Sequence, residues 1–330
     1  MGLNSILLSL IPLALSVPTS NLQPRVGGGV NLAGFDFGID GAGNKFGSYA
    51  TPPDWHIDHF ADQGVRLFRI PFGWSFIQPS VGSEIDNGFF SNYDRYVQKA
   101  LSRGARVIID FHNYGWRDNK IIGQGGVTNQ QFSDAWTKIA SRYAKNDKII
   151  FGLMNEPHDM DLNGWAKTAQ AGVQGIRKAG ATSQLILIPG LNWASAEFFP
   201  DAYPALKNIV DTDGTKNKLI FDLHKYLDVD NSGTHSECVK NNVDIFNKVK
   251  QLLASEGRQA IVSETGAATN ANCVKLMAQQ IQFISSNPQQ FIGFAAWAAG
   301  SFDTSYLNSI TPFNGNSDQP TWVSSYRPFI

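Results

Sequence analysis

The feature of the sequence that most constrains the fold is a repeat of short, continuously apolar runs. Eight such runs recur at intervals of roughly 32–44 residues, which is the length of a strand, a helix and two loops. They occupy residues 30–35, 67–70, 107–110, 149–153, 185–188, 219–222, 260–263 and 292–297. Runs that are apolar throughout, rather than at alternate positions, are typical of strands buried on both faces, as in parallel sheets.

Stretches with apolar side chains at helical spacing separate many of these runs. They cover residues 92–103, 131–145, 162–178, 243–255 and 273–285. Helices that alternate with eight buried strands predict an α/β fold, a single-domain (β/α)8 barrel of the TIM type. An open, doubly wound sheet is the alternative. Its dinucleotide loop requires glycines between a strand and a helix, whereas residues 27–29, three glycines, precede a strand and are interpreted as a turn.

An apolar segment without charge, residues 6–15, lies near the N-terminus. It is too short to span a bilayer, which needs about 20 apolar residues, and Pro12 interrupts it. Ala14 and Ser16 are small residues at the positions that signal peptidase recognises, so residues 1–16 are predicted to be a signal peptide and residues 17–330 the barrel domain. A buried N-terminal helix is the alternative. The prediction implies a secreted, extracellular protein.

The cysteines and the charge balance narrow the class of protein further. Cys238 and Cys273 are the two cysteines, and an even number in a secreted chain indicates one disulfide, with two free thiols as the alternative. There are 27 basic and 28 acidic side chains, a balance that argues against nucleic acid or an anionic membrane as a partner. A low charged fraction of 17% with 12% aromatic residues suits neutral, hydroxyl-rich ligands.

Polar residues follow most of the predicted strands, where the chemistry of such a barrel is located. Six of the eight runs end in a His, Glu, Arg or Asn beside an aromatic residue or a glycine. The candidate site residues are Arg69, His112, Asn113, Asn155, Glu156, Trp193, His224, Tyr226, Glu264 and Trp297. A barrel with a purely structural role would not need this pattern.

Glu156 and Glu264 end the fourth and seventh runs, whose strands are expected to face each other across the mouth of a closed barrel. Glycoside hydrolysis requires such a pair, one group to protonate the leaving oxygen and one carboxylate near the anomeric carbon. A separation of about 5–5.5 Å between the carboxyl groups implies retention of configuration, and about 6.5–9.5 Å implies inversion. Either glutamate alone could instead cap a helix or bind loop amides.

Several motifs together resemble the signature set of the family 5 glycoside hydrolases of clan A. They are residues 155–157 (NEP), 224–226 (HKY), 264–266 (ETG) and 297–300 (WAAG), together with Arg69 and residues 112–113. The stretch HKYLDVDNSGTHSEC, residues 224–238, is similar to the secreted fungal endo-β-1,4-glucanases, or cellulases, of that family. The resemblance extends over essentially the whole chain after residue 16.

This resemblance implies a (β/α)8 barrel and hydrolysis of internal β-1,4-glucosidic bonds in cellulose and soluble β-glucans by a retaining double displacement. It implies that Glu156 is the acid/base and Glu264 the nucleophile, with the other candidate site residues in supporting roles. It also implies a Cys238–Cys273 bridge between the loop after the sixth strand and the region after the seventh. We expect a monomer whose partner is the polysaccharide, without a cofactor or a metal ion.

Two motifs resemble metal sites but are interpreted as structural, and the role of one histidine is undecided between substrate contact and loop capping. Residues 56–59 (HIDH) are expected on a solvated outer helix, and residues 228–233 resemble a calcium loop but lack its glutamate at the twelfth position. His158 either contacts substrate or caps a loop.

The tryptophans outside the candidate site set divide in the same way. Trp74 and Trp116 are balanced between sugar stacking and packing. Four others are expected to pack: Trp55, Trp136, Trp165 and Trp322.

Three alternative functions stay open at this point. The glutamate pair does not name the sugar, so a β-mannanase or a β-1,3-glucanase on the same barrel is the first alternative. A non-catalytic carbohydrate-binding barrel is the second, although both glutamates are present. An NAD(P)-linked barrel reductase is the third, but the sequence lacks the Lys, Tyr, Asp and His arrangement expected of it.

Overall fold

The computed structural model describes residues 22–313 and 317–330. The predicted signal peptide, residues 1–16, and the start of the predicted domain at residue 17 lie outside the described residues. Among the helices that the structure describes, none combines the length and the apolar character that a membrane crossing requires.

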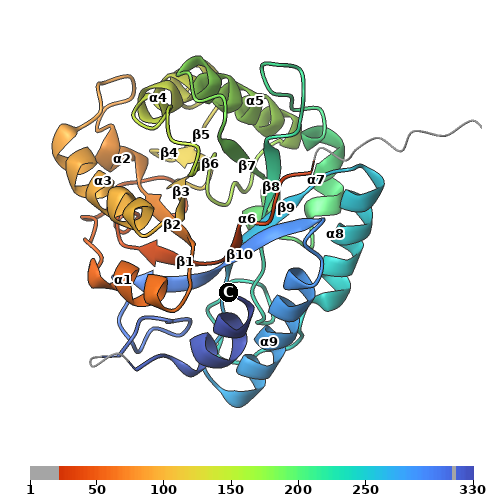
Figure 1. The fold of residues 1–330 in the computed structure, drawn as a ribbon. Coiled ribbons are helices and arrows are strands. Elements are labelled where there is room, and N and C mark those ends of the chain that lie inside the picture. The colour runs from red at the N-terminus through yellow and green to blue at the C-terminus, as the bar shows by residue number, and fades with distance from the viewer. Residues whose placement is uncertain (1–21, 314–316) are drawn as a thin grey trace, which may run out of the picture.

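The described residues form a closed barrel of parallel strands in the order β1-β10-β9-β8-β7-β6-β3-β2 (Figure 1). The strands are β1 (Gly27–Ala33), β2 (Leu67–Phe72), β3 (Arg106–Phe111), β6 (Ile149–Gly152), β7 (Leu185–Pro189), β8 (Leu219–His224), β9 (Ala260–Thr265) and β10 (Phe291–Gly300). Each strand overlaps one of the eight apolar runs. The predicted (β/α)8 barrel is therefore confirmed, and the open sheet is excluded.

Helices surround the barrel and connect its strands (Figure 1). They are α1 (Trp55–Asp62), α2 (Trp74–Ile77), α3 (Asn87–Ser102), α4 (Asn129–Ser141), α5 (Leu162–Lys178), α6 (Leu191–Ala194), α7 (Phe199–Leu206), α8 (Val243–Ser255) and α9 (Ala271–Ser285), with a small hairpin of β4 (Trp116–Arg117) and β5 (Lys120–Ile121) and the final turns η1 (Trp322–Tyr326) and η2 (Arg327–Phe329). Helix α3 begins earlier than predicted because the Asp86 side chain accepts a hydrogen bond from the Phe89 amide. A capping box of Thr128 and Gln131 likewise sets the start of α4.

The glycines at residues 27–29 begin β1, so their interpretation as a turn is wrong. A Cβ at Gly29 would lie 2.6 Å from the backbone oxygen of Leu67 on β2. A Cβ at Gly293 on β10 would lie 2.4 Å from the backbone oxygen of Gly27. Glycine is needed here because the first strand approaches its two neighbours closely where the barrel closes.

Side chains inside the barrel form layers, because alternate residues of each strand point inward. One apolar cluster contains strand residues such as Leu67, Ile108, Ile220 and Ile261, without a helix residue. A second and larger cluster joins the outward-facing strand residues to the helices. Two positions further along the same strands, the inward side chains are polar. This polar layer forms the floor of the site described below.

Helix α1 is rotated relative to the sequence-based expectation. Its buried stripe consists of His56, Ile57, Phe60 and Ala61, which face the barrel. His56 is therefore buried rather than solvated, and Trp55 is 38% exposed rather than packed. The other tryptophans expected to pack are fully buried: Trp136, Trp165 and Trp322.

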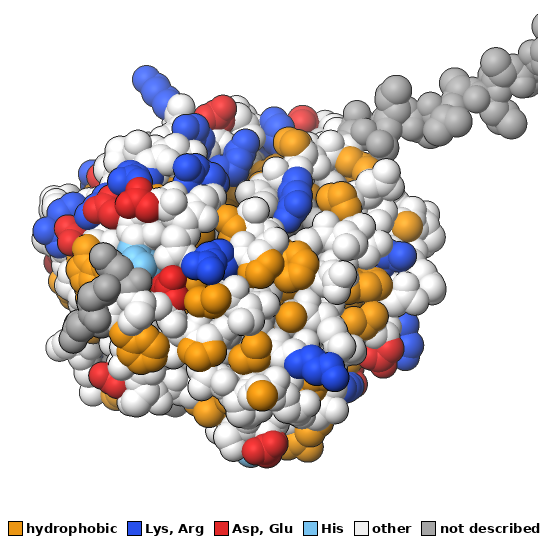
Figure 2. Space-filling view, turned by 60° about the horizontal axis from the view of Figure 1, so that its bottom comes forward, with side chains coloured by type: hydrophobic (Ala, Val, Ile, Leu, Met, Phe, Trp, Pro, Cys, Tyr) orange, Lys and Arg blue, Asp and Glu red, His pale blue; other side chains and the backbone are white. Residues whose placement is uncertain are grey.

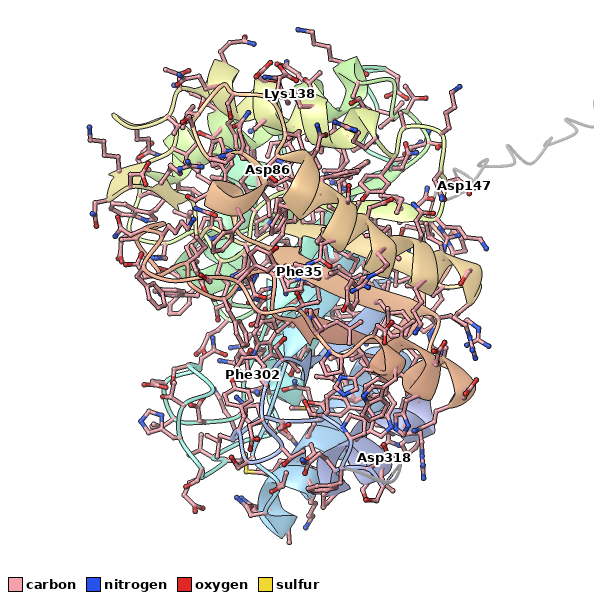
Figure 3. The ribbon with its side chains drawn as sticks, turned by 90° about the vertical axis from the view of Figure 1, so that its left-hand side faces the viewer. Phe35, Asp86, Lys138, Asp147, Phe302 and Asp318 are labelled. Carbon is pink, nitrogen blue, oxygen red and sulfur yellow. A yellow bond between two sulfur atoms is a disulfide. The ribbon has the colours of Figure 1, made fainter. Side chains whose placement is uncertain are left out.

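The two ends of the barrel can be followed from the side in Figure 3. Asp147, which precedes β6, lies at the right, and Phe302, which follows β10, lies at the left, so the C-terminal ends of the strands face left. On the face shown in Figure 2, basic and acidic side chains are interspersed among neutral ones. That mixture agrees with the near-zero net charge.

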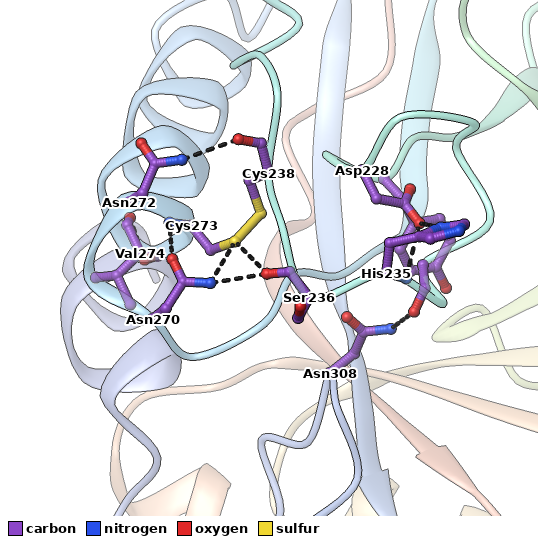
Figure 4. The surroundings of a disulfide bond; sticks show 12 residues. Asp228, His235, Ser236, Cys238, Asn270, Asn272, Cys273, Val274 and Asn308 are labelled. Carbon is purple, nitrogen blue, oxygen red and sulfur yellow. Dashed lines mark hydrogen bonds and ion pairs between the residues drawn. A yellow bond between two sulfur atoms is a disulfide. The ribbon is translucent and has the colours of Figure 1, made fainter.

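The predicted disulfide between Cys238 and Cys273 is confirmed. It joins the loop after β8 to the first turn of α9 (Figure 4). Asn272 Nδ2 donates to the Cys238 carbonyl (2.9 Å), and Asn270 Nδ2 donates to the Ser236 carbonyl (2.7 Å). The loop is thus held against α9 by hydrogen bonds on both sides of the bridge.

Candidate active site

A cleft of about 750 Å³ opens at the C-terminal ends of the strands. Both glutamates line it. Other candidate residues in its lining are His112, Trp193, Tyr226 and Trp297. The buried groups on the floor of the cleft determine how its exposed side chains are oriented.

Arg69 of β2 is fully buried and holds the floor together. Its Nη1 donates to Glu264 Oε2 (2.9 Å) and to Asn31 Oδ1 (2.9 Å), and its Nη2 donates to Asn155 Oδ1 (2.6 Å). Asp110 Oδ2 lies 2.9 Å from Nη2. Burial alone would lower the pKa of Arg69, but the charges of Asp110 and Glu264 raise it above its ordinary value. The guanidinium therefore stays charged and fixes side chains from four strands and loops.

Glu264 ends β9 and receives a hydrogen bond on each carboxylate oxygen. Arg69 binds Oε2, and the Tyr226 hydroxyl donates to Oε1 at 2.6 Å. Burial and the neighbouring charge of Glu264 raise the pKa of Tyr226 well above its ordinary value, so its hydroxyl remains a donor. Donors at both oxygens fix the orientation of the Glu264 carboxylate.

Glu156 follows β6 and adopts φ 43°, in the left-handed region. His224 Nδ1 lies 2.8 Å from its Oε1. Burial raises the pKa of Glu156 to about 7, although the charges of His112 and Arg69 partly oppose the shift. This carboxyl group can therefore both hold and release a proton near neutral pH.

One oxygen of Glu156, one oxygen of Glu264 and a ring nitrogen of His224 all lie within 4.8 Å of one another. The two glutamates, 108 positions apart in the sequence, thus meet at one end of the barrel. Their environments differ: Glu264 is held by a cation and a hydroxyl, whereas Glu156 is held by an imidazole. When two neighbouring carboxyl groups have different surroundings, they can take different catalytic roles.

His224 ends β8 between the two glutamates. Its Nε2 lies 3.1 Å from Ser263 Oγ, and burial lowers the pKa of the imidazole. A neutral ring that accepts from the serine hydroxyl at Nε2 carries its proton on Nδ1, from which it donates to Glu156. Ser263 therefore supports the tautomer that contacts Glu156.

His112 lies at the end of β3 and supports the indole of Trp297. Its Nδ1 is 2.8 Å from Asp110 Oδ2, and its ring stacks on that of Trp297 at 5.7 Å and 10°. Burial alone would lower the pKa of His112, but the hydrogen bond to Asp110 and the charge of Asp36 raise it. Trp297 Nε1 donates to the Tyr306 hydroxyl (3.3 Å), which fixes the orientation of the indole in the cleft wall.

Trp193 presents its ring to the other side of the cleft and is 42% exposed. It belongs to three successive residues with positive φ, Asn192, Trp193 and Ala194. Its ring stacks on His158 at 3.8 Å and 9°. His158 is therefore a support for Trp193, and Trp116 in turn stacks on His158 at 6.0 Å and 28°.

Trp74 and the candidate site residue Asn113 both make structural contacts near the cleft. Trp74 is fully buried, and its Nε1 donates to Gln78 Oε1. Asn113 is buried as well: its Oδ1 accepts from the Trp74 amide (2.8 Å) and its Nδ2 donates to the Trp116 carbonyl (3.0 Å). Asn113 does not line the cleft, and its hydrogen bonds shape the loop after β3, which fits the supporting role among the predicted site residues.

Sequence reasoning did not identify the polar residues beneath the two glutamates. They are Asn31, Asp36, Asp110, Asp222 and Ser263, all buried. Asp110, Asp222 and Ser263 each stand two positions after an inward-facing apolar residue within a strand. In the sequence, these residues could have been recognised as polar side chains that interrupt an otherwise apolar run two positions after an inward-facing residue.

The loop that resembles a calcium site is held by its own hydrogen bonds (Figure 4). Asp228 Oδ2 accepts from the Thr234 amide (3.0 Å), the His235 amide (3.2 Å) and the Ser232 hydroxyl (3.1 Å). The His235 ring and Asp230 lie near enough to complete a three-ligand group, but donors already occupy the Asp228 oxygen that faces them. The absence of a metal requirement stays a prediction.

Comparisons with known proteins agree on one family. The family model "Cellulase (glycosyl hydrolase family 5)" matches residues 29–301. The chain is 45% identical over 316 residues to the manganese dependent endoglucanase Eg5A of Phanerodontia chrysosporium, an alignment that covers 94% of this chain and 81% of that protein. It is 44% identical over 308 residues to endoglucanase EG-II of Hypocrea jecorina, covering 88% and 74%.

A solved structure gives the same result. The crystal structure of Cel5A (EG2) from Hypocrea jecorina superposes with a TM-score of 0.89 at 42% identity, covering 92% of this chain and 99% of that one. The resemblance inferred from the strand-end motifs is thereby confirmed. The chain belongs to the cellulase family, glycosyl hydrolase family 5.

Proposed function

We propose that this chain is a secreted endo-β-1,4-glucanase that cleaves internal bonds of β-glucans by a retaining double displacement. Glu264 is the nucleophile and Glu156 the acid/base. The observation that carries the proposal is the approach of the two carboxyl groups, with one oxygen of each and a nitrogen of His224 within 4.8 Å of one another. This spacing fits the short separation of a retaining pair and leaves no room for the water that inversion places between the groups.

In the first step a Glu264 oxygen attacks the anomeric carbon while Glu156 donates its proton to the glycosidic oxygen. The carbon–oxygen bond to the leaving chain breaks, and that chain departs as an alcohol. Burial keeps Glu156 protonated below about pH 7, and the hydrogen bonds from Arg69 and Tyr226 hold the two oxygens of Glu264 in place for the attack.

In the second step Glu156, now a carboxylate, removes a proton from water, and the water attacks the anomeric carbon of the glycosyl ester. The ester bond to Glu264 breaks and regenerates its carboxylate. Esterification removes the negative charge of Glu264, which lowers the pKa of the neighbouring acid and favours its action as a base. His224 donates from Nδ1 to the carboxylate form of Glu156.

Asn155 is placed to bind the sugar beside the reacting carbon. Its Oδ1 is held by Arg69, and its buried Nδ2 has no hydrogen-bond partner among the described residues. A buried amide donor without a partner costs free energy unless a ligand accepts from it. We assign this donor to the 2-hydroxyl of the sugar, a contact that strengthens toward the oxocarbenium-like transition state.

Trp297 and Trp193 line the cleft and are assigned to stacking on pyranose rings. Secretion, with the signal peptide at residues 1–16 and the domain at 17–330, and a monomeric state belong to the same proposal. The Cys238–Cys273 bridge supports secretion, because disulfides persist in oxidising compartments. The endoglucanase names of the relatives support β-1,4-glucan over mannan or β-1,3-glucan, and the hydrolase family excludes the binding barrel and the reductase.

The proposal is tested with Glu264→Gln and Glu156→Gln, using Glu197→Gln as the matched control, since Glu197 also lines the cleft but forms its ion pair with Lys225. We expect Glu264→Gln to lose turnover by a factor of at least about 10⁴ and the control to remain within about threefold of wild type. Proton NMR of the first product from cellotetraose should show the β anomer. An α anomer first, or near-wild-type turnover in Glu264→Gln, contradicts the proposal.

The sugar preference needs a separate assay. Carboxymethylcellulose, galactomannan and laminarin are compared at equal mass, and reducing ends are counted for each. We expect carboxymethylcellulose to be hydrolysed fastest. A higher rate on galactomannan or laminarin would identify the mannanase or β-1,3-glucanase alternative instead.

A further inference from the structure

Trp55, the first residue of α1, is an exposed aromatic side chain on a rigid support. Its indole packs nearly perpendicular to the rings of His56 (4.3 Å, 82°) and His59 (5.8 Å, 84°). His59 is itself fixed, because its Nε2 lies 2.6 Å from Asp318 Oδ1 and 2.8 Å from Gln63 Nε2. The indole is thus held in one orientation on the surface, at little further cost in conformational entropy when it binds a ligand.

Two hollows meet at this indole. The larger, of about 780 Å³, is lined by Trp55 together with Thr51, Phe302, Asp303, Thr304 and Phe313. The smaller, of about 400 Å³, is lined by Trp55, Asp58, His59, Asp62 and Gln63. Trp55 therefore forms the ridge between them, and we call the combined surface the Trp55 groove. Phe313 adds a second aromatic side chain, also 38% exposed.

The floor of the larger hollow contains polar atoms without partners. His56 Nδ1 and Ser301 Oγ are buried and have no hydrogen-bond partner among the described residues, and both residues line this hollow. The carboxylates of the smaller hollow, by contrast, are paired: Asp58 with Lys99 (2.8 Å), and both Asp58 and Asp62 with Arg103. The groove therefore offers aromatic surface and hydrogen-bonding groups, and the negative charges of Asp58 and Asp62 are balanced by neighbouring basic side chains.

The groove adjoins the catalytic cleft. The Phe302 ring lies 5.8 Å from that of Trp297 and stacks on that of Tyr306 at 4.0 Å and 11°. Trp297 and Tyr306 line the cleft, so one aromatic cluster forms a wall between the cleft and the groove. Phe302 follows β10 and lies toward the C-terminal ends of the strands in Figure 3. A polymer bound in the cleft can therefore continue across this wall.

We infer that the Trp55 groove binds a β-1,4-glucan chain outside the catalytic cleft. This inference rests on the proposed function, which supplies a polymeric substrate. A pyranose ring presents apolar C–H faces and a rim of hydroxyl groups; Trp55 and Phe313 match the faces, while Thr51, Asp303 and Gln63 match the rim. The paired carboxylates favour a neutral ligand over a charged one. The groove increases retention on the polymer without taking part in bond cleavage.

The test compares binding to hydroxyethylcellulose by affinity gel electrophoresis, in a Glu264→Gln background so that the polymer stays intact. Trp55→Ala is the main variant, Trp55→Tyr the conservative one, and Phe46→Ala the control, because Phe46 is 72% exposed but lines neither hollow. We expect the dissociation constant to rise about five- to twentyfold in Trp55→Ala, to recover in Trp55→Tyr and to stay unchanged in Phe46→Ala. Phe313→Ala is a second variant that does not depend on the α1 support.

Hydrolysis of cellopentaose by the same substitutions in the otherwise wild-type enzyme separates this inference from the proposed function. A pentasaccharide is handled by the cleft, so Trp55→Ala should retain its kcat/KM within about twofold. If Trp55→Ala and Phe313→Ala bind hydroxyethylcellulose as tightly as wild type, the groove does not bind glucan. If cellopentaose hydrolysis falls in parallel with polymer binding, Trp55 acts through the cleft and the inference is overturned. If wild type fails to cleave cellopentaose, the proposed function fails instead.

Discussion

The contrast between Glu156 and Glu264 arises from which side chains touch each carboxyl group. Arg69 and Tyr226 each donate to a different oxygen of Glu264. Glu156 instead contacts the imidazole of His224, and burial lowers the pKa of that ring. The hydrogen-bond donor beside Glu156 is therefore a neutral ring, whereas Glu264 has the charged guanidinium of Arg69. Two identical side chains thus have different surroundings, and at Glu156 burial raises the pKa of the carboxyl group.

The pH dependence of the activity should follow Glu156. Burial raises the pKa of its carboxyl group to about 7, and the acid must be protonated for the first step, so kcat/KM is expected to fall about tenfold per pH unit above this value. Cellotetraose is the substrate for the profile. A 2,4-dinitrophenyl cellobioside, whose leaving group needs no proton, should lack this descending limb. An equal descending limb for both substrates would mean that another group titrates.

Tyr226→Phe tests the hydrogen bond to the nucleophile. The hydroxyl donates to Glu264 Oε1 at 2.6 Å, and a hydrogen bond to a charged group contributes about 1.5–3 kcal/mol, so kcat is expected to fall roughly 10- to 150-fold. Tyr306→Phe is the control, since Tyr306 also lines the cleft but accepts its bond from Trp297. Its kcat should stay within about threefold of wild type, because the bond that it removes orients the Trp297 indole and does not reach the nucleophile. Equal losses in the two variants would point to general damage of the cleft.

Sequence reasoning located the exposed part of the site and missed its floor. Glu156, Glu264, His224 and Trp297 stand where strands end, a position that the repeat of apolar runs predicts directly. Asp110 and Ser263 lie within the runs, where continuous apolarity conceals which residues alternate inward. Only the closure of the barrel tells the two faces of a strand apart, because both are buried.

At the level of elements, the loop after β8 connects the catalytic residues to the outer helices. It begins at Lys225, includes cleft-lining residues such as Asp228 and Ser232, and is fastened to α9 by the disulfide. Asn308 Nδ2 also donates to the Gly233 carbonyl at 2.7 Å, which ties the loop to the segment after β10 (Figure 4). The wall of the cleft therefore depends on contacts outside the barrel.

Cys238→Ser with Cys273→Ser measures the contribution of this bridge. The cysteines are 35 positions apart, and closing a loop of this length in the unfolded chain is worth about 3–4 kcal/mol. The Tm is expected to fall by about 5–10 °C, measured by circular dichroism. Reduction of the wild-type protein should lower its Tm toward that of the variant. An unchanged Tm in the variant would show that the hydrogen bonds of Asn270 and Asn272 hold the loop without the bridge.

Helix α1 shows why the rotation of a short helix is hard to predict. The residues HIDH predict a solvated face, but Ile57 and Phe60 determine the buried stripe of α1, and His56 lies in the same stripe. Trp55 is then left at the surface. Residue type alone would place Trp55 inside and His56 at the surface, which is the reverse of their positions in the structure. The five longer helices were found from their apolar spacing, since each has several turns to establish its phase.

At the level of the whole molecule, near-zero charge matches a neutral substrate. The 27 basic and 28 acidic side chains leave a formal charge of −1, and the two signs are interspersed on the face in Figure 2. Long-range steering of a charged ligand is therefore weak. The activity should depend on contacts in the cleft rather than on an overall field.

A salt series tests this expectation. Between about 0.05 and 0.5 M NaCl, kcat/KM on hydroxyethylcellulose is expected to change less than about twofold, because screening acts on charge–charge interactions that a neutral polymer lacks. Carboxymethylcellulose in parallel reports the contribution of the polymer's own charge. A steep loss on the neutral polymer would reveal that an ion pair within the cleft is weakened by salt.

The amide of Asn31 on β1 donates to the Ser263 carbonyl on β9 (2.9 Å) and the Ala296 carbonyl on β10 (3.2 Å), while its oxygen accepts from Arg69 on β2. The first and last strands of the ring are thus joined beneath the nucleophile. We therefore expect turnover to begin only once the final strand has docked, because the Asn31 amide that contacts Arg69 takes one of its acceptors from that strand. In refolding experiments, hydrolytic activity should therefore return with the rate of barrel closure. Individual helices and strands should form earlier than the activity returns.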